Sequence, residues 1–559
     1  MVKKLINDAG DVVGEALDGL TRTCAGIARL AGSTTAVRAD VDEVRAAGQV
    51  TLLSGGGAGH EPAHAGYVGP GMLTAAVAGE VFTSPSVDAV LDGIRAVASP
   101  AGVLLIVKNY TGDRLNFGLA AELARAEGID VATVVVGDDV ALAAEAGAGR
   151  RGLAGTVLVH KVAGATAATG AKLDKVAAAA QRAADAVGTM GVALSPCTVP
   201  AAGQPGFMLD VDEIEWGLGI HGEPGVERAD LRSAAAVAQR LVEAIADDRG
   251  IGAGQRVAVL ANGLGATPPM ELSIVADAAA RCLTDRGIVV ARIWAGNFLT
   301  ALDMSGCSIS VLPVDDALLA ALDAPTSAPA WPQTVTAVEP AVRQAPPASD
   351  GVAGTLNGDD PVRRALEAAA ETLISARDEL TELDREVGDG DMGISLARGA
   401  AAVLAECPAY PGDAGPAAVL RAASATVRRS VGGTSGPLYA VLLLRAAASL
   451  EEGGDWATAF RAAVAGVCEV GGADVGDRTM VDALAPAAET FSARLPYSSG
   501  RQALTEAAEA AATGAAATAD IRARLGRSSY LGDRVLGRPD PGAEAVARWL
   551  AAVAHTLDG

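Results

Sequence analysis

The stretch Val50-Thr-Leu-Leu-Ser-Gly-Gly-Gly-Ala-Gly-His-Glu-Pro62 decides the fold of the first half of the chain. It begins as a β-strand, and the strand runs directly into a glycine-rich loop with His60 at its rim. Glycines let a backbone approach a small ligand closely. The loop lacks the G-x-G-x-x-G register because His60 takes the place of the third glycine, which disfavours a dinucleotide-binding fold.

Up to about residue 325, short β-rich runs alternate with helical stretches, as is typical of α/β layers. Helices are predicted, for example, over Ser86–Ala98 and Ala229–Ala246. A Pro- and Gly-rich stretch, Ser195–Gly206, interrupts the alternation, so we expect two α/β subdomains that meet near residue 190. Strands are predicted at Val50–Ser54, Gly102–Val107, Asp130–Val136, Thr156–His160, Arg256–Ala261, Val289–Trp294 and Ser308–Leu312.

The composition changes after residue 325. Residues 326–357 are rich in Pro and Ala and suit an extended linker. Beyond them strand signals nearly vanish, and apolar residues recur at helical spacing in Pro361–Leu380, Ala417–Arg429, Leu438–Ser449 and Ala503–Ala516. The predicted fold class is an α/β N-terminal part of two subdomains (residues 1–190 and 191–325), followed by an all-α helical bundle or barrel (residues 358–559).

The composition also excludes several classes of function. The 559 residues carry a formal net charge of −23, which argues against a nucleic-acid partner because phosphate binding needs a basic face. The six cysteines lie far apart without a C-x-x-C pair, so neither a zinc site nor a disulfide framework is expected. The start of the chain does not resemble a signal peptide, and no run of ~18 apolar residues occurs. We therefore expect a cytoplasmic protein with no membrane partner.

An acidic loop in the helical part predicts a metal site. Asp384, Asp389 and Asp391 follow the spacing D-x4-D-x-D between two predicted helices. Carboxylates this close repel one another unless a cation neutralises them, and oxygen ligands suit Mg²⁺ or Ca²⁺. An EF-hand is excluded because the twelfth position counted from Asp389 is Ala400, where a bidentate Glu is required. The acidic turn could instead be merely solvated, but Mg²⁺ with nucleotide phosphates fits better.

A second glycine-rich segment, Ser430-Val-Gly-Gly-Thr-Ser-Gly-Pro437, opens another predicted helix. Backbone amides at the start of a helix can cradle phosphate. The chain has no G-x4-G-K-[ST] motif, no His-Arg-Asp and no Asp-Phe-Gly. If the chain is a kinase, its architecture is an uncommon one.

Two further segments of the α/β part contain candidate functional residues. Lys108-Asn-Tyr-Thr-Gly-Asp113 follows a predicted strand, at the sheet edge where open α/β sheets bind ligands. His221 lies in Gly217–Gly225, a glycine-flanked turn that presents a nucleophile able to capture a small carbonyl compound. Together with the acidic loop, this turn indicates a kinase that holds its substrate covalently. We expect His64, His160 and His555 to be structural.

Several of these segments closely resemble those of dihydroxyacetone kinases, and the resemblance covers nearly the whole chain except the predicted linker. It looks like the single-chain form, in which a substrate-binding α/β part is fused to a nucleotide-binding helical barrel. The matching segments are Gly55–Gly66, Lys108–Asp113, Arg151–Lys161, Gly219–Gly225, Asn262–Met270, the acidic loop, Ser529–Arg534 and Asp540–Ala543.

The resemblance implies a role for each residue of the substrate site. His221 would add to the substrate ketone and form a hemiaminal, which selects carbonyl compounds over glycerol. Asp113 would accept the proton of the attacking hydroxyl, and His60 would hydrogen-bond the substrate and assist transfer. The implied substrate-binding residues are Gly57, Ala58, Gly59, His60, Lys108 and Asp113.

The resemblance also implies ATP and Mg²⁺ as cofactors. Asp384, Asp389 and Asp391 would hold two Mg²⁺ ions that bridge the ATP phosphates. The implied nucleotide-binding residues are Met392, Gly393, Ile394, Ser395, Thr434, Ser435, Gly471, Met480, Arg527, Asp540, Pro541 and Gly542.

Three positions depart from the family pattern. Ala58 and Ala301 each stand where Ser is usual, and Met392 replaces His, Cys or Thr. The two alanines could reshape the substrate pocket, so D- or L-erythrulose is a second candidate substrate beside dihydroxyacetone. The motifs are also compatible with a phosphorylated protein as phosphate donor, and with a ligand-sensing regulatory protein. We expect a homodimer, in which the helical part of one chain could serve the α/β part of its partner.

Overall fold

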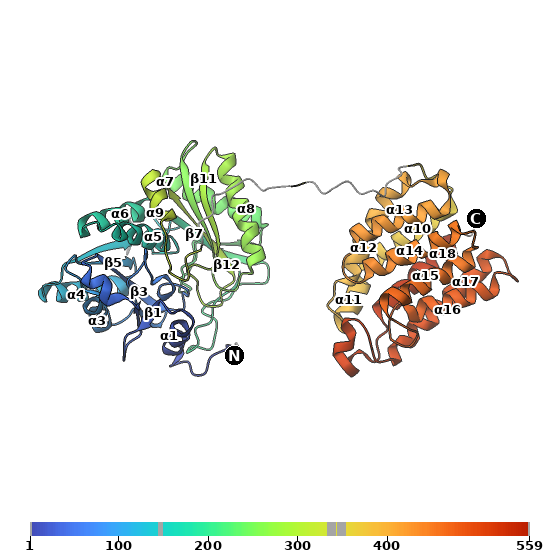
Figure 1. The fold of residues 1–559 in the computed structure, drawn as a ribbon, viewed down its shortest axis with the longest axis horizontal. Coiled ribbons are helices and arrows are strands. Elements are labelled where there is room, and N and C mark those ends of the chain that lie inside the picture. Colours follow the sequence, from blue (N-terminus) through green and yellow to red (C-terminus); the bar gives the residue numbers. More distant parts are fainter. Residues whose placement is uncertain (1–2, 144–148, 333–342, 344–353, 557–559) are drawn as a thin grey trace. The chain divides into compact units, whose positions relative to one another are not determined.

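The computed structural model describes residues 3–143, 149–332, 343 and 354–556, shown as a ribbon in Figure 1. The chain divides into two compact units, Met1–Val342 and Arg343–Gly559. The first unit combines helices with two sheets, and the described part of the second contains helices only. The predicted fold class, an α/β part followed by an all-helical part, is therefore confirmed.

The first sheet places the predicted ligand loops at one edge. Its strands β3, β4, β5 and β6 pair in parallel, whereas β1 and β2 join antiparallel on the β4 side. The carboxyl ends of β3 and β5 therefore lie side by side at the same edge. In sheet order the strands are β1 (Ile27–Arg29), β2 (Thr35–Arg38), β4 (Ala75–Val81), β3 (Thr51–Ala58), β5 (Val103–Lys108) and β6 (Val131–Val136).

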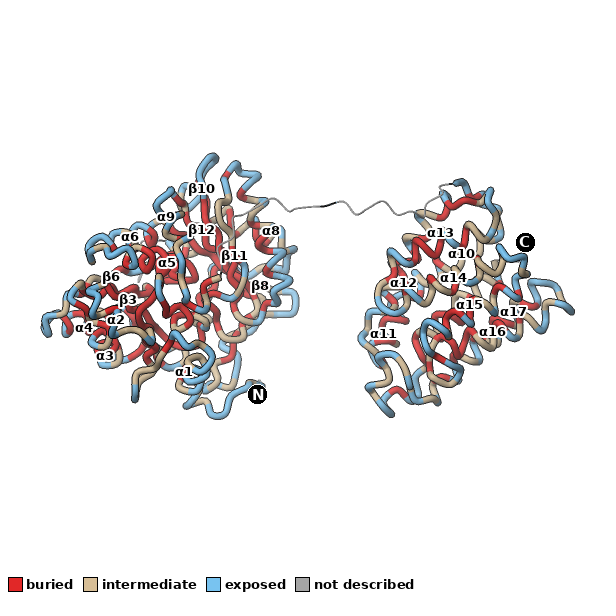
Figure 2. Tube along the Cα trace, in the orientation of Figure 1, coloured by how far each residue is buried: buried red, intermediate tan, exposed pale blue. Residues whose placement is uncertain are grey.

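Helices cover both faces of this sheet. Successive side chains along a strand point to opposite faces, so each strand packs against both layers of helices. Leu52 and Leu104 pack towards α5 and α6, whereas Leu53 and Leu105 pack towards α3 and α4. Figure 2 shows β3 and α5 among the buried parts of the unit. The helices of this half are α1 (Val12–Thr23), α2 (Val41–Ala46), η1 (Ala65–Tyr67), α3 (Val87–Val97), α4 (Thr111–Ala126), α5 (Gly155–Ala168) and α6 (Leu173–Ala186).

One predicted strand is wrong: Thr156–His160 lies inside helix α5. The apolar run is buried on all sides, and a short fully buried run cannot be assigned to helix or strand by its periodicity. A distant residue stabilises the start of the helix. Asp138 accepts hydrogen bonds from the backbone N–H groups of Leu153 (2.6 Å) and Gly155 (2.9 Å).

The second sheet begins with β7 and is mostly antiparallel, with β10 and β11 as its parallel pair. Helices α7 and α8 pack on one face, and α5 and α9 line the other. Helix α7 starts later than predicted because Glu227–Asp230 forms an edge strand and Ser233 caps the helix. The elements are β7 (Gly188–Ala193), β8 (Glu213–Trp216), β9 (Glu227–Asp230), α7 (Ala234–Arg249), β10 (Arg256–Gly263), α8 (Pro269–Asp285), β11 (Val289–Gly296), β12 (Gly306–Pro313) and α9 (Asp316–Asp323).

At both ends of the predicted linker, residues 326–357, described residues pack against the units and do not form an extended tether. Trp331 is buried and packs on Trp294, with ring centroids 5.1 Å apart. The N–H of Ala330 donates to the carbonyl of Gly66 (2.9 Å). At the other end Leu356 is buried in the helical unit. Burial of these apolar side chains holds both ends against the units, and residues 333–342 and 344–353 lie outside the described ranges.

The helical unit is a closed ring. Each helix from α12 to α18 contacts the next one, α10 contacts α12, and α18 returns to contact α10. The helices are α10 (Pro361–Ser375), α11 (Arg377–Val387), α12 (Met392–Glu406), η2 (Cys407–Ala409), η3 (Gly412–Ala414), α13 (Pro416–Ser430), α14 (Ser435–Glu451), α15 (Trp456–Gly471), α16 (Val481–Arg494), α17 (Gly500–Ala517), η4 (Thr518–Asp520), η5 (Arg527–Val535) and α18 (Pro541–Thr556).

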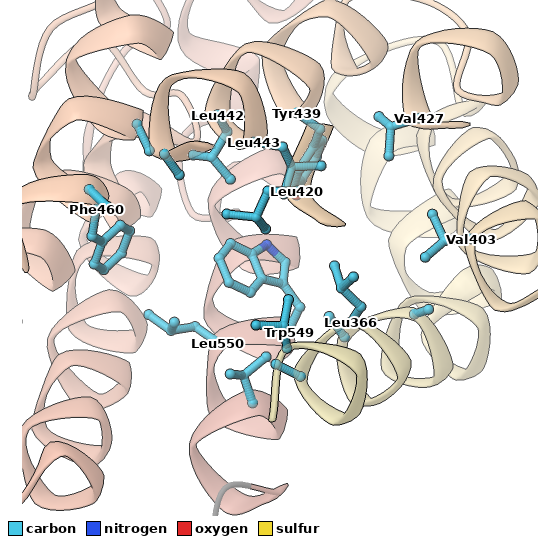
Figure 3. A pocket seen from close by; sticks show the side chains of 18 of the residues that line it. Leu366, Val403, Leu420, Val427, Tyr439, Leu442, Leu443, Phe460, Trp549 and Leu550 are labelled. Carbon is cyan, nitrogen blue, oxygen red and sulfur yellow. The ribbon is translucent and has the colours of Figure 1, made fainter. Parts of the chain in front are cut away.

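The ring encloses an apolar cavity of about 580 Å³, seen from close by in Figure 3. Side chains from helices far apart in the sequence point into it, among them Leu366, Val403, Leu442 and Trp549. The inward faces of the helices are thus apolar, as expected of a barrel of amphipathic helices. In the described parts of both units, no helix combines the length and apolar character needed to cross a bilayer.

The packing of α5 gives a test of the fold. A Cβ added at Gly164 would collide with the backbone of Gly71 and Met72, whereas one added at Gly118 in α4 meets nothing. We expect Gly164→Ala to destabilise the chain by about 1–3 kcal/mol through overpacking. Gly118→Ala is the matched control and should stabilise it by about 0.5–1 kcal/mol. Chemical denaturation measures both, and equal stability of the two variants would refute the close approach.

Candidate active site

Strand β3 extends through Gly55–Ala58, which the sequence predicted to be a loop, so the loop that carries His60 begins at Gly59. Close backbone contacts shape the glycines at the end of the strand. A Cβ at Gly55 would collide with the carbonyl of Val77, and one at Gly57 would lie 2.6 Å from the N of Thr83. Both positions therefore require glycine. The loop delivers His60 to the interior, where its side chain is fully buried.

His60 is held in one orientation and one protonation state. Its Nδ1 lies 2.7 Å from the carbonyl oxygen of Thr300, so Nδ1 carries the proton and donates. Burial, followed by the charges of His221 and Lys108, holds the pKa of His60 well below its usual value. His60 is consequently neutral, and its Nε2 offers a lone pair.

The residues that carry Thr300 come from the second sheet. Asn262, at the end of β10, accepts from the N–H groups of Phe298 and Leu299 and donates to the carbonyl of Leu299. The Thr300 hydroxyl in turn donates to the carbonyl of Glu61 (2.8 Å). The orientation of His60 thus depends on a segment about 240 residues away.

His221 meets His60 at the same place. Its Nε2 lies 3.1 Å from Nε2 of His60, and its Nδ1 lies 2.8 Å from a carboxylate oxygen of Glu223. The rings of Phe82 and Tyr110 contact His221 edge to face, with centroids 5.2 and 4.6 Å away. Burial raises the pKa of Glu223, but the hydrogen bond and charge of His221 outweigh it and hold the pKa below its usual value. Glu223 is therefore a carboxylate that accepts the Nδ1 proton of His221.

A second group gathers around Gly56. A Cβ at Gly56 would lie 2.6 Å from Nζ of Lys108 and 3.5 Å from Oδ2 of Asp113. Lys108 ends β5 and Asp113 lies in the first turn of α4, so the neighbouring strand ends bring both groups to the loop. The second carboxylate oxygen of Asp113 is buried and has no hydrogen-bond partner among the described residues. This oxygen is available to a ligand.

Lys108 is supported by two histidines, His64 and His160, that the sequence alone predicts to be structural. Its Nζ lies 2.7 Å from Nε2 of His64, whose Nδ1 lies 3.0 Å from Nε2 of His160. Burial lowers the pKa of Lys108, although Asp113 opposes this, and burial lowers the pKa of His160 to about 3. Burial also holds the pKa of His64 well below its usual value. Both imidazoles are therefore neutral, and they orient the Lys108 nitrogen towards Gly56.

In the helical unit the three predicted metal ligands come together. Asp384, Asp389 and Asp391 each offer a carboxylate oxygen, and these oxygens lie within 4.8 Å of one another. Asp384 lies in the last turn of α11 and is buried, and its Oδ2 accepts from the N–H groups of Asp391 (3.0 Å) and Met392 (3.1 Å). An all-oxygen set of this kind fits Mg²⁺. In the structure the guanidinium of Arg527 pairs with Asp389 and lies 3.8 Å from Asp391.

Most of the predicted nucleotide residues lie at or next to the ends of helices. Ile394 and Ser395 are in the first turn of α12, and Thr434 and Ser435 start α14. A Cβ on Gly432 would lie 3.7 Å from the hydroxyl of Ser395, so these two helix starts are neighbours. Gly393 has a packing role, because a Cβ there would collide with α11.

A second group of these residues gathers at the start of α18. Pro541 is its first residue, and Asp540 accepts from the N–H of Ala543 (2.9 Å). A Cβ on Gly542 would lie 3.6 Å from Met480. Burial raises the pKa of Asp540 to about 6. Gly471 is the last residue of α15. A Cβ there would contact α14 and not this group.

Several residues of the site were not predicted from the sequence. Glu223 lies within the glycine-flanked turn, two residues from His221, and its spacing could have suggested a partner. No local signal points to Thr300 or to the pairing of His64 with His160, because their partners are distant in the sequence.

The aspartate cluster makes a testable metal site. Asp389→Asn should weaken Mg²⁺ binding, because it removes one charge without disturbing the helix cap made by Asp384. Arg527→Met should strengthen Mg²⁺ binding in the absence of nucleotide, because it removes the competing cation. The rise of the unfolding temperature with added Mg²⁺ measures both effects. Asp413→Asn, at an exposed acid elsewhere in the unit, is the control, and an unchanged Mg²⁺ response in Asp389→Asn would rule the cluster out.

Comparison with known proteins identifies both units. The Dak1 domain matches residues 18–330, and the DAK2 domain matches residues 386–555. The human triokinase/FMN cyclase is 42% identical, over 99% of this chain and 99% of its own. A D-erythrulose kinase of Mycolicibacterium smegmatis is 39% identical, over 91% of each chain. The structure of the dihydroxyacetone kinase from C. freundii in complex with AMP-PNP and Mg²⁺ superposes with a TM-score of 0.66 at 35% identity, covering 99% of this chain and 100% of that one.

The two sites and these similarities define a kinase, a phosphotransferase with an alcohol group as acceptor. The chain belongs to the dihydroxyacetone kinase family, in the form that joins both domains in one polypeptide.

Proposed function

We propose that the chain is an ATP-dependent kinase that phosphorylates dihydroxyacetone to dihydroxyacetone phosphate while the ketone is bound covalently to His221. The observation that carries the proposal is the pair of contacts on the His221 ring. Glu223 holds the proton on Nδ1, and Nε2 faces the lone pair of His60. This arrangement prepares Nε2 as a nucleophile.

Covalent capture follows from moving one proton. We assign one proton to Nδ1 of His221, which lies 2.8 Å from Glu223, and one proton to the pair of Nε2 atoms of His221 and His60, which lie 3.1 Å apart. His60 accepts the Nε2 proton, Nε2 bonds to the ketone carbon as the C=O π bond breaks, and His60 returns the proton to the new oxygen. The product is a hemiaminal whose imidazolium charge stays paired with Glu223. The low pKa of His60 makes its protonated form a strong acid, which favours the return of the proton.

Phosphoryl transfer uses the second group of residues. Asp113 accepts the proton of the terminal hydroxyl with its unpartnered buried oxygen, and Lys108 donates to a substrate oxygen near Gly56. Bound at Asp384, Asp389 and Asp391, Mg²⁺ and ATP would supply the phosphoryl group and neutralise the charge on its oxygens. The relative from C. freundii, which binds AMP-PNP and Mg²⁺, supports this choice of cofactors.

A longer ketose is a second candidate substrate. One relative is a D-erythrulose kinase and another is a triokinase/FMN cyclase. Ala58 and Ala301 have small side chains at the glycine loop and at the segment that follows Thr300, where the resemblance leads us to expect Ser. Loss of two hydroxyls gives room for an additional carbon in the ketose. D- and L-erythrulose therefore belong in the same assay as dihydroxyacetone.

The mechanism predicts a preference for ketoses over glycerol, which the shape of the substrate site alone does not give. In a coupled ATP assay, dihydroxyacetone and the erythruloses should be phosphorylated, whereas glycerol should not, because it has no carbonyl carbon for Nε2 to attack. His221→Ala should lower kcat/KM for the ketose by roughly a thousandfold or more. His555→Ala, at the end of α18, is the control and should remain fully active. Turnover of glycerol as fast as that of the ketoses would refute covalent capture.

We further propose that the chain acts as a homodimer in which the helical unit of one protomer serves the α/β unit of the other. Neither His221→Ala nor Asp389→Ala should be active alone, because each lacks one half of the chemistry. A mixture of the two variants should recover part of the activity, since it pairs an intact α/β unit with an intact helical unit. Absence of any recovery in the mixture would contradict the exchange between chains.

A further inference from the structure

The turn that carries His221 is fastened to the first sheet by one arginine. Arg151 donates from Nη2 to the carbonyl of Gly217 (2.6 Å) and from Nε to Oδ2 of Asp139 (2.7 Å). Arg151 and Asp139 are both buried, so their charges interact with little screening by solvent. Arg151 follows β6 in the sequence, whereas Gly217 lies in the turn after β8. The hydrogen bond from Arg151 to Gly217 thus joins the two halves of the α/β unit.

The same arginine approaches the carboxylate that holds His221. A Cβ at Gly219 would collide with Oε2 of Glu223 and would lie 2.7 Å from Nη1 of Arg151. Oε2 of Glu223 and Nη1 of Arg151 therefore both lie beside Gly219, which has to be a glycine for this reason.

Tyr110 also packs against the His221 ring. Its ring contacts His221 with centroids 4.6 Å apart, and its buried hydroxyl has no hydrogen-bond partner among the described residues. Burial, with the negative charge of Glu223 as the next cause, raises the pKa of Tyr110 well above its usual value. Tyr110 therefore stays neutral, and Arg151 is the cation that pairs with Asp139.

We infer that Arg151, anchored by Asp139, is a positioning residue that sets the His221 turn and keeps Glu223 aligned with Nδ1. The inference rests on the proposed covalent capture of the ketose. Without Arg151 the carbonyl of Gly217 loses its donor, and the buried carboxylate of Asp139 loses its paired cation. Both effects displace the imidazole from the carbonyl carbon, and small displacements of a reacting group are costly.

The test is the formation of the adduct itself, observed on the full chain without nucleotide. Dihydroxyacetone labelled with ¹³C at its ketone carbon is titrated, and NMR follows the labelled carbon as it becomes tetrahedral. Arg151→Met should need a ketose concentration higher by about tenfold or more for half-maximal adduct. Asp139→Asn should show a smaller effect in the same direction, and Arg151→Lys should restore part of the loss because a cation still reaches the turn.

Arg150→Met is the matched control. Arg150 precedes Arg151 in the chain and pairs with Asp248 through Nη1 (2.8 Å) and Nη2 (2.5 Å). Neither Gly217 nor Glu223 is among its hydrogen-bond partners in the described part of the chain, so it does not hold the His221 turn. It should form the adduct with the affinity of the unmodified chain, even if its unfolding temperature falls as much as that of Arg151→Met.

The outcomes separate this inference from the proposed function. An adduct in Arg151→Met at unchanged affinity, with only the unfolding temperature lowered, assigns Arg151 a purely structural role and overturns the inference while the hemiaminal stands. If the unmodified chain turns over the ketose but gives no tetrahedral carbon signal, covalent capture itself is refuted, and the role of Arg151 falls with it.

Discussion

In the proposed mechanism, a single proton between two imidazoles governs the capture of the ketose in the α/β unit. His60 is committed by the Thr300 carbonyl to carry its proton on Nδ1, and Glu223 fixes the Nδ1 proton of His221. The two Nε2 atoms, 3.1 Å apart, can therefore hold only one proton between them. Wherever that proton resides, the other nitrogen has a free lone pair. In the proposed mechanism one imidazole is the base and the other is the nucleophile, and this division of roles would give a preference for ketones.

The pairing of His60 with His221 forms only because both sheets contribute residues to it. The glycine loop after β3 supplies His60, and the turn after β8 supplies His221. The carbonyl of Thr300 comes from the segment that follows β11, which Asn262 holds in place. The carboxyl ends of β3 and β5 add Gly56, Lys108 and Asp113. The helical unit has a simpler requirement, since a helix cap by Asp384 brings three carboxylates to one point.

The amino-acid sequence predicted the parts of this arrangement that are local. Alternating strands and helices, the loop with His60 and the aspartate spacing were all readable from adjacent residues. The misassigned strand at Thr156–His160 shows the limit, because its helix is capped by the distant Asp138 and buried on every side. The supporting groups were not predictable for the same reason. The partners of His60, Lys108 and Arg151 lie far from them in the sequence, and only the folded chain joins them.

The most direct measurement of covalent capture is a crystal structure of the chain soaked with dihydroxyacetone. We expect continuous electron density from Nε2 of His221 to a tetrahedral C2 of the ketose, with Nδ1 still bonded to Glu223 and the new hydroxyl within reach of His60. A planar ketose, bound in a competent site but separated from the imidazole by a non-bonded distance, would contradict it.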